Sequence, residues 1–170
     1  GVVVRSSNYA LYADMSQRLM SLLESQVEEL EVYSIDEAFA RISRPAAGDL
    51  LPWGRRLRAL ARRNLGLPIA IGLGASKSQA KLANRLAKVE APHAGLFDLG
   101  HCSNRDRWLE TIAIEDVWGI GRKLAQWCRM HGVCNARELR DMASGPLRAK
   151  AGVVGLRLQR ELQGHACLPL

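Results

Sequence analysis

The chain has 170 residues, 48% of them hydrophobic, which suits one or two small globular domains. Its formal net charge of +7 favours a polyanionic partner, of which nucleic acid is the commonest. We find neither a secretory leader nor an apolar run of transmembrane length. The four cysteines form no Cys-x-x-Cys pair, so we expect reduced thiols in a cytosolic protein. Cys128, His131 and Cys134 offer only three local ligands, fewer than a structural zinc site uses.

The first hundred residues alternate between helical and strand-like patterns. We expect helices at Tyr9–Leu23, Leu51–Leu65 and Lys77–Val89, and strands at Val27–Tyr33, Ala38–Ile42, Pro68–Gly74 and Leu96–Phe97. This order is typical of an α+β fold, with an antiparallel-rich sheet and helices on one face. Ser76 is expected to cap the third helix. The arginines of the second helix are interpreted as a solvated basic face.

The strand pattern stops after about Gly100. Short helical segments alternate with glycines from there on, at Arg105–Thr111, Ile114–Val117, Arg122–Met130, Ala136–Met142 and Val153–Leu162. We therefore place a domain boundary near Leu99–Asn104 and expect a small all-α domain after it.

Two adjacent carboxylates, Asp36 and Glu37, interrupt the apolar run from Val32 to Ile42. The flanking strands predict an antiparallel hairpin with these carboxylates at or near its tip, where a bend lets both approach one site. Ionised carboxylates are costly to bury unless a cation pairs with them, and hard oxygen ligands suit Mg²⁺. The alternative is a solvated Asp-Glu turn without a chemical role.

A second motif follows the strand that ends at Gly72-Leu73-Gly74. The helix after it carries Lys77, Lys81 and Lys88 at spacings that place them on one face. A cationic helix beside a glycine-rich turn can bind phosphates, although the Walker A spacing is absent. The alternative is a solvated lysine stripe.

A third motif is Val117-Trp118-Gly119-Ile120-Gly121-Arg122-Lys123-Leu124. A Gly-x-Gly turn between short helices, followed by basic residues, is typical of a helix-hairpin-helix. Its glycines let backbone N–H groups approach a phosphate oxygen, so the motif binds the DNA backbone without reading sequence. Arg148 to Gly152 is interpreted as a second, degenerate basic turn.

These three motifs in this order resemble the palm and thumb of the Y-family, lesion-bypass DNA polymerases. Ser7–Ser16 and Glu161–Leu168 further resemble the UmuC branch, which acts in bacterial DNA polymerase V. The resemblance implies the end of the fingers at residues 1–8, a partial palm at 9–100 and a helix-hairpin-helix thumb at 101–170. The implied palm is a ferredoxin-like antiparallel sheet with helices on one face.

The resemblance also implies roles for individual residues. Asp36 matches a palm metal ligand, and Glu37 the adjacent glutamate that completes the site at the primer terminus. Lys88 lies where the family keeps a lysine near the incoming triphosphate, with Lys77 and Lys81 adding positive potential. The Gly119-Ile120-Gly121 turn, with Arg122 and Lys123, matches the hairpin that binds the DNA backbone.

The implied activity is error-prone, template-directed nucleotidyl transfer with two Mg²⁺ ions, in DNA repair and the SOS response of the bacterial cytoplasm. The implied partners are primer-template DNA and dNTP, and in the full-length protein processed UmuD, RecA and the sliding clamp. A DinB-type polymerase and a non-catalytic helix-hairpin-helix module remain alternatives.

The sequence also departs from the family pattern. No strand with the family's first metal-binding aspartate precedes Ser6, and most of the fingers and the little finger have no counterpart. We therefore expect a fragment that is inactive by itself.

Overall fold

A computed structural model describes residues 2–43, 49–89 and 95–170 and shows two compact units. The first unit comprises residues up to 48, residues 55–69 and Leu170. The second unit comprises residues 49–54 and 70–169. No helix among the described residues is both long enough and apolar enough to cross a membrane.

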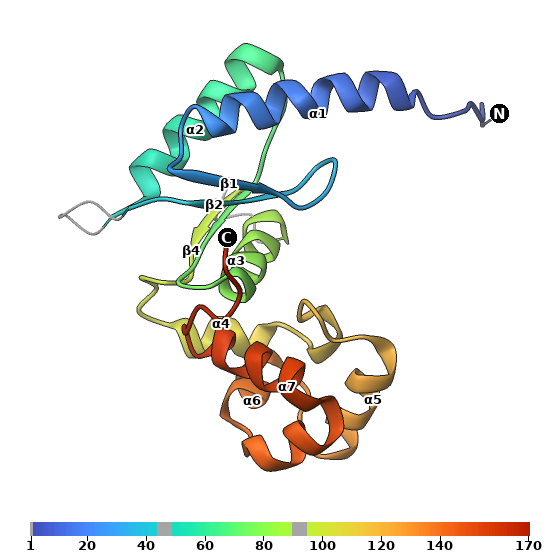
Figure 1. Cartoon of the computed structure of the whole chain (residues 1–170), viewed down its shortest axis with the longest axis vertical. Helices are drawn as coiled ribbons and strands as arrows, with labels where there is room; N and C mark the ends of the chain where they lie inside the picture. The colour runs from blue at the N-terminus through green and yellow to red at the C-terminus, as the bar shows by residue number, and fades with distance from the viewer. Residues whose placement is uncertain (1, 44–48, 90–94) are drawn as a thin grey trace. The chain divides into compact units, whose positions relative to one another are not determined.

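The first unit holds a helix, a hairpin and most of a second helix (Figure 1). Its elements are α1 (Tyr9–Glu24), β1 (Glu29–Val32), β2 (Ala38–Arg41) and the part of α2 (Leu51–Leu65) from residue 55 onward. The Asn8 side chain caps α1 by accepting the N–H of Leu11 at 3.1 Å. The strands pair antiparallel, as predicted, and their register places Val32 opposite Ala38. Both helices lie on the same side of the hairpin in Figure 1.

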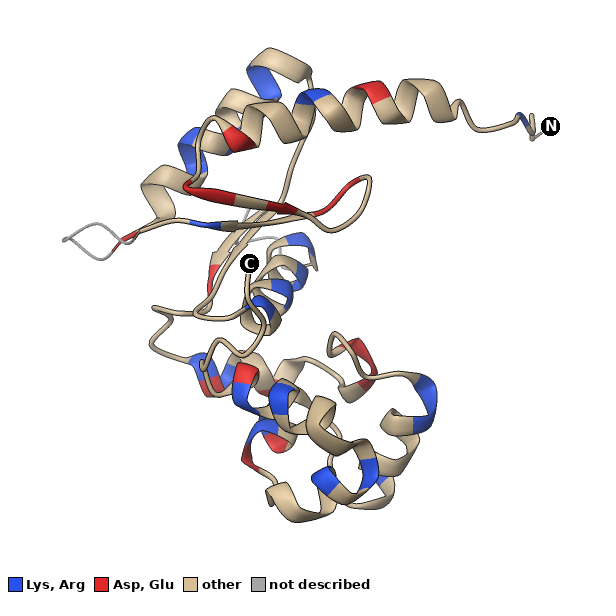
Figure 2. Cartoon of the chain, in the orientation of Figure 1, with Lys and Arg blue, Asp and Glu red and all other residues tan. Residues whose placement is uncertain are grey.

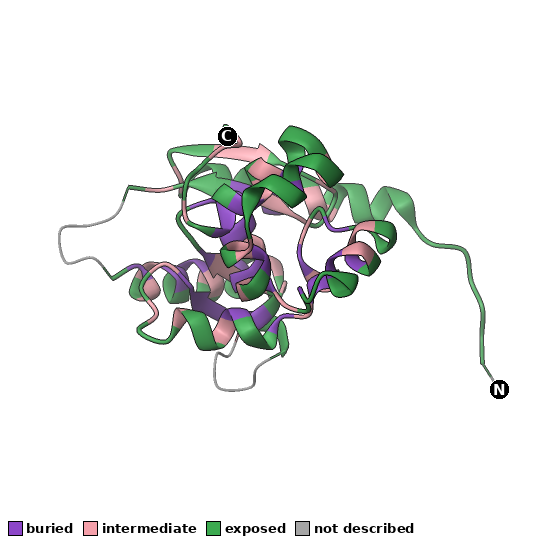
Figure 3. Ribbon diagram, turned by 90° about the horizontal axis from the view of Figure 1, so that it is seen from below, coloured by how far each residue is buried: buried purple, intermediate pink, exposed green. Residues whose placement is uncertain are grey.

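Apolar side chains from α1, β2 and α2 are buried in this unit. Leu19 and Met20 of α1, Phe39 of β2, and Leu57 and Ala61 of α2 are each at most 9% exposed. The chain before α1 is exposed throughout its described residues (Figure 3). The hairpin and its helices are thus held by a small apolar interior.

The second unit begins with a strand–helix–strand segment. β3 (Ile71–Leu73), α3 (Lys77–Val89) and β4 (Leu96–Asp98) follow one another, and β4 pairs with β3 in parallel, Ile71 opposite Leu96. Parallel neighbours need a long crossover connection, and α3 lies within that connection here. The expected antiparallel sheet is therefore present in part, in β1–β2. Among the described residues, the strands form two separate two-stranded sheets.

Helices alone follow residue 100, as the sequence predicts. They are α4 (Arg105–Thr111), the 3₁₀ helix η2 (Ile114–Asp116), α5 (Arg122–Met130), α6 (Ala136–Asp141) and α7 (Ser144–Leu162). α7 is longer than the predicted Val153–Leu162 and is interrupted at Gly152, which has φ 62°. The segment predicted as a second basic turn is therefore helical up to this interruption.

One hydrophobic core joins α3 and β4 to the later helices. It includes Leu82, Leu99, Leu109, Ile114, Leu139, Leu147 and Leu162, each at most 1% exposed. Residues on both sides of position 100 thus pack into one unit. The division into a palm at 9–100 and a thumb at 101–170 remains a prediction.

Candidate functional site

The acidic residues lie at the tip of the β1–β2 hairpin, beyond the last paired residues. The Glu37 carbonyl accepts the N–H groups of Tyr33 and Ser34, both at 3.0 Å, and closes the turn. The Ser34 hydroxyl donates to Asp36 Oδ1 at 2.7 Å. Asp36 is exposed and Glu37 half-buried. Ile35, which precedes them, is 50% exposed, so the hairpin tip is open to solvent.

The tip offers a partial set of metal ligands. Asp36 and Glu37 supply hard carboxylate oxygens on consecutive residues, which suits a Mg²⁺ ion that also takes water and phosphate oxygens. No group of three or more His, Cys, Asp or Glu residues able to hold a metal occurs within residues 2–43, 49–89 and 95–170. The tip residues fit a shared site that needs another carboxylate.

The start of α3 is fixed by its cap and by contact with β3. The N–H of Gln79 donates to the Ser76 hydroxyl at 3.2 Å, which confirms Ser76 as the N-cap. A Cβ at Gly72 would lie 2.0 Å from the backbone nitrogen of Asn84 and 2.3 Å from the Ala80 carbonyl oxygen. Gly72 is thus required for the close approach of β3 to α3.

The three lysines of α3 have different environments. Lys77 is 9% exposed, Lys81 is half-buried and Lys88 is exposed. A uniformly solvated stripe is therefore not what the structure shows. Figure 2 shows the Lys and Arg residues distributed along α3, and of the three lysines only Lys88, in the last turn, is exposed.

The Gly-x-Gly turn lies directly before α5. Gly119 has φ 88°, and the N–H of Ile120 donates to the Val117 carbonyl at 2.9 Å. Ile120 is 7% exposed and packs into the hydrophobic core, which fixes the turn to the rest of the unit. Gly121 is extended, and a Cβ there would meet no atom within 4 Å. The backbone of this turn is therefore open to a close partner.

The basic residues at the turn are exposed, whereas the carboxylates near it are ion-paired. Arg122 and Lys123, the first residues of α5, are exposed. The neighbouring carboxylates are neutralised by ion pairs, Asp116 with Arg85 at 2.5 Å and Glu115 with Arg129. The Asp116–Arg85 pair also links η2 to α3. The exposed Arg122 and Lys123 therefore lie near carboxylates that already have ion-pair partners, which the sequence motif alone did not establish.

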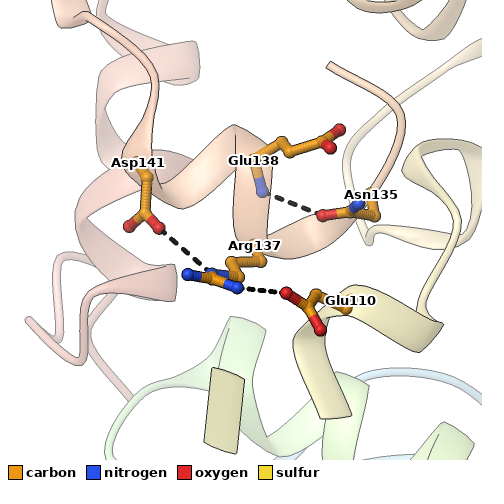
Figure 4. Close-up of a pocket in the computed structure, with 5 residues that line it drawn as sticks. All are labelled: Glu110, Asn135, Arg137, Glu138 and Asp141. Atoms are coloured by element: carbon orange, nitrogen blue, oxygen red, sulfur yellow. Dashed lines mark hydrogen bonds and ion pairs between the residues drawn. The ribbon is translucent and has the colours of Figure 1, made fainter. Parts of the chain in front are cut away.

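A surface pocket between α4 and α6 is lined by charged side chains that bind one another (Figure 4). Arg137 lies between Glu110 and Asp141 and forms ion pairs with both, and Asn135 accepts the N–H of Glu138 at 2.9 Å. The Arg137–Glu110 pair joins α6 to α4, and the other two contacts lie within α6 and its N-cap. The pocket is accounted for by helix packing.

The cysteine–histidine segment has no metal-site character. Cys128 is fully buried, and burial raises the pKa of its thiol, which opposes the thiolate that zinc requires. His131 Nδ1 lies 2.8 Å from the Trp127 carbonyl oxygen, and Cys134 is exposed.

Two family models match the chain. The impB/mucB/samB family model matches residues 1–85, which include α1, the acidic hairpin and α3 up to Arg85. The chain belongs to the impB/mucB/samB family. The model of the IMS family HHH motif matches residues 103–133, which include the Gly119–Gly121 turn. The expected resemblance to Y-family polymerases and the helix-hairpin-helix are thereby confirmed.

Curated relatives align over all or nearly all of the chain. UmuC of Salmonella typhimurium is 40% identical over 172 aligned residues, which cover 100% of this chain and 41% of that protein. DNA polymerase IV of Corynebacterium diphtheriae is 33% identical over 97% of this chain and 36% of its own length. The chain thus spans about two fifths of the length of the curated relatives it matches.

Solved structures share the fold. A DinB family error-prone DNA polymerase from Sulfolobus solfataricus aligns with a TM-score of 0.74 at 20% identity, over 96% of this chain and 50% of that one. A binary complex of Dbh DNA polymerase aligns with a TM-score of 0.75 at 24% identity, over 95% and 47%.

Proposed function

We propose that the chain is the partial palm and the thumb of an error-prone translesion DNA polymerase, a template-directed nucleotidyltransferase. The observation that carries this proposal is the Asp36–Glu37 pair at an exposed hairpin tip, within the segment that matches the family model. Relatives of this chain are named UmuC and DNA polymerase IV, which supports the same reaction.

Asp36 and Glu37 would hold Mg²⁺ together with a carboxylate from a part of the protein beyond these 170 residues. Two bound ions would lower the pKa of the primer 3′-hydroxyl and neutralise charge on the triphosphate. Ser34, which donates to Asp36 Oδ1, orients that carboxylate for this role. Without the further carboxylate, the 170-residue chain would not catalyse extension.

The lysines of α3 would bind the anionic end of the nucleotide. Lys88, exposed in the last turn, would stabilise charge on the leaving pyrophosphate. Lys77 and Lys81 are less exposed and would act mainly through their positive potential.

The Gly119–Gly121 turn would bind the DNA backbone. The open backbone at Gly121 lets an N–H group approach a phosphate oxygen, and Arg122 and Lys123 add charge at the same place. Contact of this kind positions DNA of any sequence, as a polymerase requires.

The biological setting belongs to this proposal as well. The substrates would be primer-template DNA and dNTP. The protein would act in the bacterial cytoplasm during the SOS response. Identity is higher to UmuC, 40%, than to the DNA polymerase IV, 33%, which favours a UmuC-type over a DinB-type protein. Processed UmuD, RecA and the sliding clamp would then be its partners.

Primer extension separates this proposal from a non-catalytic helix-hairpin-helix module. The gene product that contains this chain is assayed with Mg²⁺ on an undamaged template and on one with an abasic site. A polymerase of this type incorporates nucleotides on both. DNA binding without incorporation on either template would favour the binding module.

A further inference from the structure

Glu161, in the last turn of α7, is a fully buried carboxylate with three backbone donors. Its Oε2 accepts the N–H of Ser78 at 2.9 Å, and its Oε1 accepts the N–H groups of Cys167 and Leu168 at 2.6 and 3.1 Å. Burying a carboxylate is costly unless such donors replace water. One side chain therefore joins α7, the first turn of α3 and the segment after α7.

Two more hydrogen bonds surround this carboxylate. The Ser76 hydroxyl donates to the Glu161 carbonyl at 2.6 Å, and the Gln79 amide donates to the Leu162 carbonyl at 3.0 Å. Carbonyls at the end of α7 thus accept from side chains at the start of α3, and the start of α3 in turn donates the N–H of Ser78 to Glu161. A carboxylate at the start of α3 also interacts favourably with the helix dipole.

The same helix contacts the DNA-binding turn one turn earlier. A Cβ at Gly119 would lie 3.9 Å from Leu158 Cδ2, so α7 packs directly beneath the Gly119–Gly121 turn. Leu158 and Glu161 are three residues apart and lie on neighbouring positions of one helical face. α7 is therefore a short physical link between that turn and the start of α3.

We propose that Glu161 is a positioning residue, which holds the first turn of α3 at a fixed place relative to the Gly119–Gly121 turn. Lys77 precedes the Glu161-bound Ser78 directly, and Lys81 follows one turn later. This inference rests on the proposed function, in which the α3 lysines bind the triphosphate and the turn binds DNA. Glu161 then sets the spacing between nucleotide and DNA.

The decisive variant is Glu161→Gln in the gene product that contains this chain. It keeps the volume but replaces one acceptor oxygen with an amide NH₂, so at least one of the three backbone N–H groups loses its acceptor. We expect the KM for dNTP to rise about fivefold or more, kcat to change by less than about twofold, and the Kd for DNA to stay within about twofold. Hydrogen exchange at Ser78, Cys167 or Leu168 should also accelerate.

A matched control is Gln159→Leu. Gln159 is 2% exposed in the same helix, and its amide binds the Met142 carbonyl and the Ser144 hydroxyl, both at 2.7 Å. This variant loses buried hydrogen bonds within the later helices without touching α3. We expect Gln159→Leu to lower the melting temperature about as much as Glu161→Gln does, and to leave the KM for dNTP at the wild-type value.

Gln79→Leu removes the hydrogen bond from the Gln79 amide to the Leu162 carbonyl, and so disturbs the same contact between α3 and α7. The test therefore still works if Glu161→Gln does not fold. Gln79→Leu should raise the KM for dNTP as Glu161→Gln does. If the wild type is active, two results would overturn this inference alone. One is an unaltered KM for dNTP in folded Glu161→Gln and Gln79→Leu variants, and the other is an equal rise of KM in Gln159→Leu. A wild type without nucleotide incorporation would overturn the proposed function together with it.

Discussion

Gly119 and Gly121 lie two residues apart in one turn and meet different constraints. Gly119 has φ 88°, a conformation that costs a residue with a Cβ about 1–2 kcal/mol. Gly121 has φ −80°, and a Cβ there meets open space. We expect Gly119→Ala to destabilise the fold, whereas Gly121→Ala costs at most about 1 kcal/mol and mainly weakens DNA binding. Thermal unfolding and a DNA-binding titration of both variants check this.

Gly145→Ala is the control for these two substitutions, because its Cβ also meets no atom within 4 Å and it lies in the first turn of α7. It should leave both stability and DNA affinity close to the wild type. A folded Gly121→Ala variant with wild-type DNA affinity would show that the backbone at Gly121 does not contact DNA.

Gly72 is constrained by packing. A Cβ at this position would lie 2.0 Å from the backbone nitrogen of Asn84, and backbone atoms of α3 cannot move aside as a flexible side chain can. We expect Gly72→Ala to lower the free energy of unfolding by about 3 kcal/mol and the melting temperature by roughly 6–12 °C. Calorimetry measures both, and a shift below about 1 °C would contradict the close approach.

At the scale of elements, α6 is tied to α4 by Arg140, which bonds Asp141 and also Asp106, the latter at 2.6 Å. Its guanidinium lowers the pKa of both carboxyls below their ordinary values. A lowered pKa means that the folded state favours the ionised form. The resulting stabilisation is present above the ordinary carboxyl pKa of about 4 and is lost as the pH falls through the lowered values.

Arg140→Gln should therefore destabilise the protein at neutral pH and have less effect under acid. We expect the melting temperatures of variant and wild type to differ at pH 7 and to converge as the pH falls through the lowered pKa values of Asp106 and Asp141. Thermal unfolding across this range measures the difference. A difference that stays constant with pH would assign the effect to lost packing.

Most element bounds could be predicted because local signals fix them. α2, α3, α4 and α5 begin and end at the predicted residues, helped by the Ser76 cap and by the helical spacing of apolar residues. α7 was predicted too short because Gly152 and its basic neighbours favour a turn, whereas the helix resumes after one residue. The parallel pairing of β4 with β3 depends on contacts distant in sequence.

The sequence motifs predicted where the candidate site residues lie in the fold. They did not predict how far each side chain is buried. The hairpin tip, the lysine helix and the Gly-x-Gly turn all occur where the motifs predict. The burial of Lys77 and the exposure of Asp36 could not be predicted, because both depend on how separate elements pack. Glu161 was missed as a joint for the same reason: its partners Ser76 and Ser78 lie more than eighty residues away in sequence.

At the scale of the whole molecule, a net charge of +7 predicts salt-sensitive binding to DNA. We expect Arg122→Gln and Lys123→Gln each to reduce the slope of log affinity against log salt concentration by about 0.9. Arg137→Gln is the control, because Arg137 is paired with Glu110 and Asp141 in the α4–α6 pocket. A DNA titration at several salt concentrations distinguishes them. Equal slopes in all three variants would place the DNA on another surface.

Mg²⁺-dependent primer extension by the gene product tests most directly whether Asp36 is a metal ligand of a polymerase. Asp36→Asn keeps the size of the side chain and removes its charge, while Asp14→Asn makes the same change on α1, where Asp14 forms an ion pair with Arg18. We predict a loss of about 10³-fold or more for Asp36→Asn, with DNA affinity retained, and near-wild-type activity for Asp14→Asn. Extension by Asp36→Asn at the wild-type rate would contradict the account.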